Sequence, residues 1–102
     1  MSRHRLAIRL LEAAEEDLID FITYVAADRP AAAQTIADRI EKSLELLRVN
    51  PRSGRVPREP DLAKLGYRYL VILDYLFFYK IHKDCVLVYR ILHGARNYAR
   101  LL

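Results

Sequence analysis

The sequence predicts an α+β domain with the element order β-α-α-β-β-β, in which an N-terminal helical hairpin packs on a mostly antiparallel four-stranded sheet. Two observations predict this fold. Apolar residues recur at helical spacing through most of the first half, and residues that favour strands dominate the second half. A chain of 102 residues has room for one hydrophobic core, so we expect a single domain over residues 1–102. A hydrophobic content of 53% is typical of a folded protein and argues against a disordered chain.

The first half of the chain predicts one strand followed by two helices. Polar and apolar residues alternate over residues 4–10, as in a half-buried strand. The period then becomes helical, and acidic residues crowd the first turn of a helix expected over about 12–27, where the helix dipole favours them. Pro30 suits the first position of a second helix, whose apolar stripe runs from Ala33 to Leu47. The short turn between the helices predicts an antiparallel hairpin.

The second half begins with a long loop and continues as a sheet. Residues 50–66 contain most of the prolines and several arginines, which predicts an irregular basic loop. Loops of this length within a small domain are often functional. Lys83-Asp84 is short enough to be a hairpin turn. Three strands are expected after the loop: 67–73, 75–82 and 85–92.

The predicted sheet has more apolar surface than two helices can cover. A helical hairpin covers one face of a four-stranded sheet, so we expect the second face to be at least partly exposed unless a partner covers it. The last strand is apolar on both sides: Leu87, Tyr89 and Ile91 fall on one side, and Val86, Val88, Arg90 and Leu92 on the other. This pattern is typical of a strand buried on both faces. Either a second copy of the chain or a different protein would satisfy it.

Positive charge is concentrated in the second half. Residues 1–50 hold 7 basic and 9 acidic groups, whereas residues 51–102 hold 10 and 4, a net charge of +6. A polarised domain of this kind suits an acidic partner, either a nucleic acid or an acidic peptide.

Thirteen of the seventeen basic residues are arginine, whose planar fork matches phosphate and carboxylate groups. Four of them lie in or after the expected strands and are candidates for binding: Arg68, Arg90, Arg96 and Arg100. Asp74 and Asp84 are the carboxylates that we expect to pair with them if their role is structural.

The remaining chemistry is sparse. His93 follows the last strand and lies near Asn97 and Tyr98 in the sequence, so these residues can form a small polar cluster. The single cysteine, Cys85, excludes an internal disulfide and a zinc site with several thiolate ligands. No metal motif or glycine-rich phosphate loop is present, so no cofactor is expected. No signal-peptide core or bilayer-spanning stretch is present either, and we expect a cytoplasmic protein with no membrane partner.

Motifs in four segments follow one another in a familiar order. They are the acidic and then apolar segment 15–22, the loop Pro51-Arg52-Ser53-Gly54-Arg55, the strand residues 68–71 with Tyr75 and 77–81, and the ending 88–97 with its His93-Gly94-Ala95-Arg96-Asn97. On these segments the chain resembles the RelE/ParE superfamily of bacterial toxins from type II toxin–antitoxin modules, and it is most similar to the ParE branch. It departs from the family at Leu11-Glu12, where a capping Ser-Pro is usual, and at Asn97, where an aspartate is usual.

The resemblance implies a toxin that a cognate antitoxin neutralises in a hetero-oligomeric complex, with the antitoxin tail wrapped around the toxin. It implies inhibition of DNA gyrase for the ParE branch, without nuclease activity. The alternative is a RelE-like endoribonuclease that cuts mRNA on the ribosome, with Arg68 and Arg90 on the phosphate and His93 or Tyr98 in the proton steps. We favour gyrase because the catalytic lysines of the RelE branch have no obvious counterpart in this chain. A further alternative is a non-toxic remnant that retains antitoxin binding. The candidate partner- or target-binding residues are Arg55, Arg68, Tyr75, Arg90, His93 and Arg96.

Overall fold

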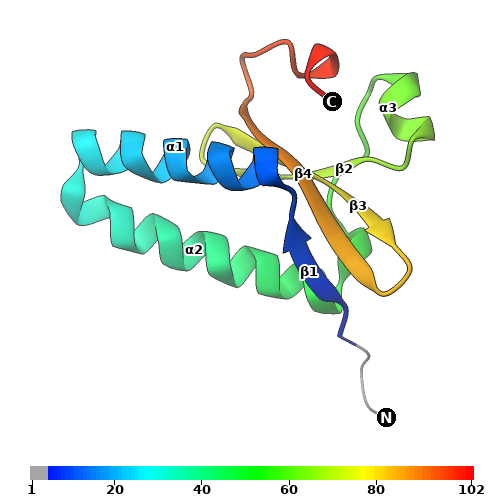
Figure 1. The fold of residues 1–102 in the computed structure, drawn as a ribbon, viewed down its shortest axis with the longest axis horizontal. Helices are drawn as coiled ribbons and strands as arrows, with labels where there is room; N and C mark the ends of the chain where they lie inside the picture. Colours follow the sequence, from blue (N-terminus) through cyan, green and yellow to red (C-terminus); the bar gives the residue numbers. More distant parts are fainter. Residues whose placement is uncertain (1–4) are drawn as a thin grey trace.

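The computed structural model describes residues 5–102 and has the predicted order of main elements (Figure 1). The first residue of the strand expected over 4–10 therefore lies outside the described residues. The helices and strands are β1 (Ala7–Leu10), α1 (Glu12–Asp28), α2 (Pro30–Val49), α3 (Pro60–Lys64), β2 (Arg68–Ile72), β3 (Tyr75–His82) and β4 (Cys85–His93), with 3-10 turns η1 (Pro51–Ser53) and η2 (Tyr98–Arg100).

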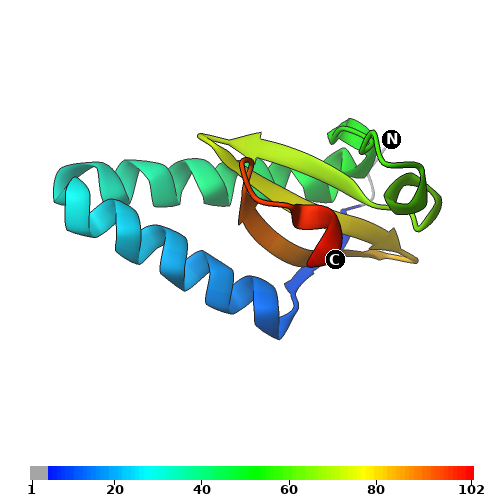
Figure 2. The same cartoon turned by 90° about the horizontal axis from the view of Figure 1, so that it is seen from above.

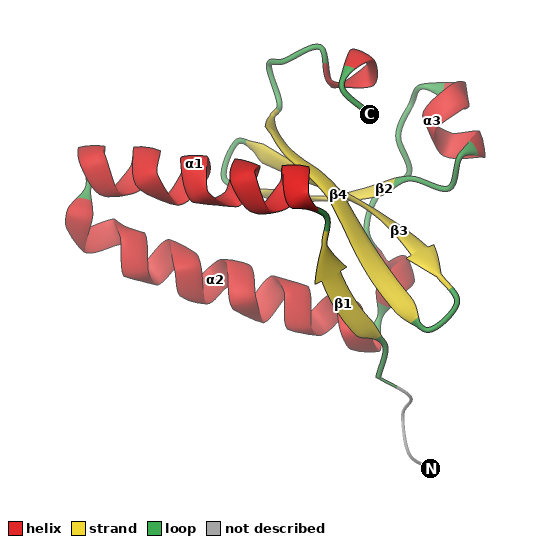
Figure 3. Cartoon of the chain, viewed as in Figure 1, coloured by secondary structure: helices red, strands yellow, loops and turns green. Residues whose placement is uncertain are grey.

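The four strands form one sheet in the order β1-β4-β3-β2 (yellow in Figure 3). β1 runs parallel to β4, and the other two pairs are antiparallel, which confirms the prediction of a mostly antiparallel sheet. β1 is short and its last residue, Leu10, pairs with Val88. Among the strands of residues 5–102, none therefore lies beside β4 beyond Val88 on the side of β1.

The main core lies between the helical hairpin and one face of the sheet. α1 buries Ala14, Phe21 and Val25, which share one side of the helix because they are separated by about two turns and one turn. The Phe21 ring stacks on Tyr75 of β3 at a centroid distance of 4.0 Å. Full burial of one such ring is worth about 2 to 3 kcal/mol, so the aromatic residues of α1 and β3 fix the hairpin on the sheet.

The start of α1 is held by its backbone rather than by a capping side chain. Leu11 at the N-cap makes no side-chain cap hydrogen bond, as its departure from the usual Ser-Pro predicts. Its backbone amide instead donates to the carbonyl oxygen of Val88 at 2.9 Å. The chain thus passes directly from β1 into α1 while still hydrogen-bonded to β4.

The second face of the sheet, which was predicted to be at least partly exposed unless a partner covers it, is covered in large part by the chain itself. A second buried cluster of Leu62, Tyr67, Phe78 and Leu92 lies on this face. It is covered by α3, which interrupts the loop predicted over 50–66, and by the C-terminal residues from Tyr98 onward. Figure 2 shows the C-terminal turn and α3 away from the helical hairpin.

The predicted alternation of side chains in β4 is also wrong beyond Val88. The register of β3 against β4 shifts between Phe78 and Tyr79, so Tyr79 pairs with Val88 but Phe78 pairs with Arg90. The extra residue reverses the faces that follow it. As a result, Ile91 lies with Val86 and Val88 in the main core, and Leu92 lies in the second cluster. Side chains on both faces of β4 are therefore buried, which explains why both faces of this strand are apolar.

Candidate functional site

A carboxylate of α1, Asp17, accepts hydrogen bonds from β4 at the edge beyond Val88. The Arg90 guanidinium donates from Nε to Asp17 Oδ2 at 2.7 Å and from Nη2 to Oδ1 at 3.1 Å. The backbone amide of Ile91 donates to the same Oδ2 at 2.9 Å, in place of the strand that β1 does not provide. The two charged side chains are only 23% and 14% exposed. This is a geometry in which an ion pair contributes to stability.

Asp17 therefore corrects the prediction that Asp74 or Asp84 would pair with Arg90. The side-chain hydrogen bond that Arg90 donates to Asp17 is the main cause that raises the pKa of Arg90 above its ordinary value, and burial opposes it. Arg90 Nη1 also donates weakly to the carbonyl oxygen of Leu101 at 3.5 Å. The guanidinium thus joins α1, β4 and the C-terminal segment.

A pocket of about 330 Å³ lies between α1 and the last residues of β4, and it brings together three predicted site residues. Tyr75 packs edge-on against His93 at 5.3 Å, and Arg96 lines the same pocket. His93 Nδ1 accepts a hydrogen bond from the amide of Ala95 at 3.1 Å, so in the neutral ring the proton is on Nε2. The pocket is lined by Asp17, Asp20, Phe21, Tyr24, Tyr75, Ile91, His93 and Arg96.

At the other end of the sheet, a buried tyrosine locks the loop that follows α2. The Tyr79 hydroxyl donates to the Pro51 carbonyl oxygen at 2.6 Å and accepts from the Gly54 amide at 3.0 Å. A Cβ atom at Gly54 would lie 2.7 Å from Tyr79 Cε1, so only glycine fits there. Burial raises the pKa of Tyr79, which keeps the hydroxyl protonated and able to donate.

The two predicted arginines of this region have different surroundings. Arg68 Nη1 donates to the carbonyl oxygens of Arg52 at 3.1 Å and Gly54 at 3.0 Å, so the guanidinium supports the loop. Arg55 instead joins the sheet edge through its backbone, which exchanges two hydrogen bonds with Tyr69 at 2.8 and 2.9 Å. Its side chain is exposed and no described carboxylate lies within ion-pair distance.

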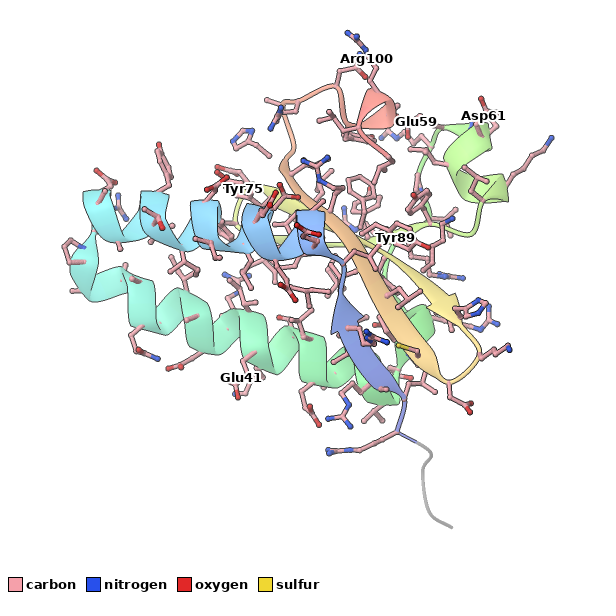
Figure 4. The ribbon with its side chains drawn as sticks, in the orientation of Figure 1. Glu41, Glu59, Asp61, Tyr75, Tyr89 and Arg100 are labelled. Carbon is pink, nitrogen blue, oxygen red and sulfur yellow. The ribbon has the colours of Figure 1, made fainter. Side chains whose placement is uncertain are left out.

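Tyr98 lies in the C-terminal segment, on the second face of the sheet. Its hydroxyl donates to Glu59 at 3.0 Å, and its ring packs on Phe78 at a centroid distance of 4.9 Å. Burial, followed by the hydrogen bond to Glu59, raises the pKa of Tyr98. Figure 4 shows Glu59 between the C-terminal segment, marked by Arg100, and α3. Tyr98 therefore ties the end of the chain to the residues before α3.

The structure does not gather the four ribonuclease candidates around one point. Arg68 is opposite Tyr79 in the sheet, whereas His93 is opposite Tyr75, four residues away along β3. At about 3.3 Å per residue this separation is about 13 Å. Arg68 is hydrogen-bonded to the loop after α2, Arg90 is hydrogen-bonded to Asp17, and Tyr98 is hydrogen-bonded to Glu59.

The hairpin carries an apolar groove on its outer side. It has a volume of about 240 Å³ and is lined by residues of α1 and α2, including Glu41, which Figure 4 labels on α2. Its lining side chains are Leu18, Ile22, Ala37, Ile40, Glu41 and Leu44. Among residues 5–102, no cluster of three potential metal ligands occurs. None of the described helices has the length and hydropathy that a membrane span needs.

A family model described as the ParE toxin of the type II toxin–antitoxin system, parDE, matches residues 8–98. The chain belongs to the ParE toxin family. No curated protein matches it.

Two solved structures show the same fold as this ParE-family chain. A chain of the chromosomal ParDE toxin–antitoxin system from P. aeruginosa has a TM-score of 0.70 and 18% identity, with 88% of this chain and 97% of that chain covered. A chain of the toxin–antitoxin complex RelBE2 from Mycobacterium tuberculosis has a TM-score of 0.61 and 23% identity, with 87% and 98% covered. Since chains from a ParDE system and from a RelBE2 complex both share this fold, the fold alone does not decide between the two predicted activities.

Sequence reasoning on this ParE-family chain missed three residues that organise the site: Asp17, Tyr79 and Glu59. Asp17 carried a signal, because it lies three residues after Ala14 and four before Phe21, on the side of α1 that faces the sheet. Tyr79 lies on the same strand face as the buried Phe77. A tyrosine at such a position has a buried hydroxyl that needs a hydrogen-bond partner, so the sequence carried a signal for it. Glu59 had no local signal, since its partner Tyr98 is 39 residues away.

Proposed function

We propose that this ParE-family chain is the toxin of a type II toxin–antitoxin module and that it poisons DNA gyrase by trapping the complex with cleaved DNA. The family match supports the first part. The second part rests on the branch of the superfamily that the chain matches and on one structural observation, the dispersal of the ribonuclease candidates.

That dispersal argues against RNA cleavage. Cutting RNA requires a base for the 2′-hydroxyl, an acid for the leaving oxygen and cations at the same phosphate. In this chain Arg90 is hydrogen-bonded to Asp17, and Tyr98 is hydrogen-bonded to Glu59. Arg68 supports a loop and is separated from His93 by about 13 Å along the direction of β3. These contacts support structural roles for the three bonded side chains.

The exposed arginines are better placed to meet a target. Arg55 and Arg96 are exposed, and neither makes an ion pair with a described residue. They lie at opposite ends of the sheet, one beside the start of β2 and one after β4. We assign target contact to these two and a supporting role to Arg68 and Arg90.

A cognate antitoxin is the proposed partner, and the apolar groove between α1 and α2 supports its docking there. The groove offers aliphatic side chains from both helices on the surface of the domain. Ile19 and Leu46, which are 65% and 62% exposed, extend the apolar surface of the hairpin. An antitoxin segment that folds on this surface would cover them at the entropic cost typical of coupled folding and binding.

The test uses the purified chain with gyrase, ATP and supercoiled plasmid. We expect linear DNA after denaturation of gyrase, and none when the cognate antitoxin is added first. Ribosomes with bound mRNA form the second arm, in which we expect no cleavage at codon positions. Cleavage of mRNA without linear plasmid would overturn the gyrase proposal. If cells that express the chain without antitoxin grow normally, both toxic activities are contradicted.

His93→Ala separates the two activities further. On the proposed function it retains most of the plasmid linearisation, whereas a ribonuclease that used His93 would lose orders of magnitude in rate. His82→Ala is the matched control, because His82 is an exposed histidine at the end of β3 and lines neither pocket described above.

A further inference from the structure

A cationic pocket, distinct from the site around His93, lies where β3 extends beyond the start of β2. It has a volume of about 450 Å³ and is lined by Arg52 from η1, Arg68 from β2 and Lys83 from the β3–β4 turn. β2 begins opposite Tyr79, so the last residues of β3 project past it and carry the turn to the pocket. Three segments far apart in sequence thus bring three cations to one small volume.

The pocket contains the groups that bind phosphate and lacks those that would repel it. Its other lining residues are Val56, Ala63, Gly66, Tyr67 and Ile81, so no carboxylate lines it. Arg68 is held in place by its two hydrogen bonds from Nη1 to backbone carbonyl oxygens. The ion pairs within residues 5–102 join carboxylates to Arg5, Arg29, Arg48 and Arg90, and none of these pairs includes Arg52, Arg68 or Lys83.

The geometry of its turn places Lys83 at the pocket. Its backbone φ is 54°, and Leu73, at the same position of the turn between β2 and β3, has a φ of 55°, so both two-residue hairpin turns use the left-handed region. The turn between β3 and β4 thereby brings the Lys83 side chain to the pocket lining.

We infer that this pocket binds the phosphates of duplex DNA. The aromatic residue of its lining, Tyr67, is 5% exposed and cannot stack on an unpaired base, so the pocket suits a duplex better than a single strand. Neighbouring phosphates of a duplex present many anionic oxygens at high charge density to converging cations, which suits DNA better than the spaced carboxylates of a peptide. The inference goes beyond the proposed function, since it requires no gyrase.

The experiment measures binding of a fluorescent duplex to the purified full chain by anisotropy over a series of salt concentrations. The logarithm of the wild-type association constant, plotted against the logarithm of the salt concentration, should have a slope of about −2.7 or steeper, because each of three phosphate contacts contributes about −0.9. In the double variant Arg52→Gln/Lys83→Gln the slope should be shallower by about 1.8, and binding at low salt should be about tenfold weaker. Arg68 is left unchanged, because it also supports the loop.

The control is Arg39→Gln/Lys42→Gln, which removes the same charge from the exposed face of α2. Its slope should stay close to that of the wild type. Equal losses in both double variants would overturn the inference, because they would show an effect of net charge alone. It is also overturned if a poly-glutamate peptide displaces the duplex as well as unlabelled DNA does. Loss of gyrase poisoning with intact DNA binding would instead count only against the proposed function.

Discussion

Single side chains in this protein link elements that the backbone does not join. Asp17 is the clearest case, because one carboxylate accepts hydrogen bonds from the Arg90 guanidinium and from the Ile91 amide. Removing it would leave a half-buried guanidinium and a strand amide without their acceptor. A lost partner of this kind costs more than the pair itself contributes.

Asp17→Ala should therefore lower the free energy of unfolding by about 2 to 3 kcal/mol, measured by urea denaturation. Asp20→Ala is the matched control, because Asp20 is exposed on the same helix and forms no ion pair with a described residue. A control loss as large as that of Asp17→Ala would show that the helix charge, rather than the contact with β4, is responsible.

Gly54→Ala should destabilise the loop after α2, because the new Cβ would collide with the Tyr79 ring. We expect a loss of about 2 kcal/mol or more in thermal or urea unfolding, as for overpacking of a core. Gly94→Ala provides the comparison, since a Cβ there would meet its nearest neighbour, the Asp74 carbonyl oxygen, at 3.4 Å. Similar losses for the two variants would contradict the proposed close fit.

Alkaline pH should destabilise the fold through its buried tyrosines. Burial raises the pKa of Tyr79, Tyr67 and Tyr98 in the folded chain. The folded state therefore holds these protons more tightly than the unfolded state, whose tyrosines titrate near pH 10, so stability is present below that pH and is lost as the pH rises above it. In Tyr79→Phe the fall in the free energy of unfolding above pH 10 should be shallower than in the wild type. An unchanged slope would contradict the role of Tyr79.

At the scale of elements, the C-terminal segment acts as part of the fold. Tyr98, Leu101 and Leu102 pack against the cluster that contains Phe78 and Leu92, and the Tyr98 hydroxyl reaches Glu59. The segment and α3 thereby supply the second cover of the sheet.

Deletion of residues 98–102 should expose this cluster. We expect a loss of about 2 to 4 kcal/mol in the free energy of unfolding and increased binding of a hydrophobic dye. Tyr98→Phe keeps the ring and removes only the hydrogen bond to Glu59, so its loss should be about 1 kcal/mol. If the deletion costs no more than this substitution, the segment does not cover the sheet in solution.

Long elements with a clear period were predictable from the sequence, and short ones that depend on distant partners were not. Helices α1 and α2 and the three last strands lie close to the predicted ranges, because their apolar residues repeat over many positions. α3 has five residues, too few for a periodic pattern. The irregularity between Phe78 and Tyr79 is a property of two paired strands, so neither strand alone carries its signal.

The candidate site was predictable in part for the same reason. His93, Tyr75 and Arg96 were identified from their segments, and the structure brings them to one pocket. The partner of Arg90 could not be chosen correctly among the carboxylates, because Asp17 is 73 residues away and only the short length of β1 exposes the strand edge to it.

At the scale of the whole molecule, exposed positive charge is found at both ends of the sheet. Arg55 lies beside the start of β2 and Arg96 follows β4, and both side chains are exposed. A target that contacts both must span the sheet, which fits a large partner better than a small ligand.

Arg55→Gln/Arg96→Gln should reduce plasmid linearisation by gyrase by about tenfold or more, as loss of two charged contacts predicts, while the melting temperature changes little. The measurement is the toxin concentration that gives half-maximal linear DNA, with circular dichroism as the test of folding. Arg29→Gln/Arg39→Gln, which changes two exposed arginines of the hairpin, is the control. Equal loss of activity in the two double variants would contradict the assignment.

The pairing of β1 with β4 has a consequence for synthesis. Ala7 lies opposite Cys85, so the sheet cannot close until the ribosome has made β4. A nascent chain that is released before β4 lacks the strand with which β1 must pair. Products truncated before β4 should therefore remain unfolded.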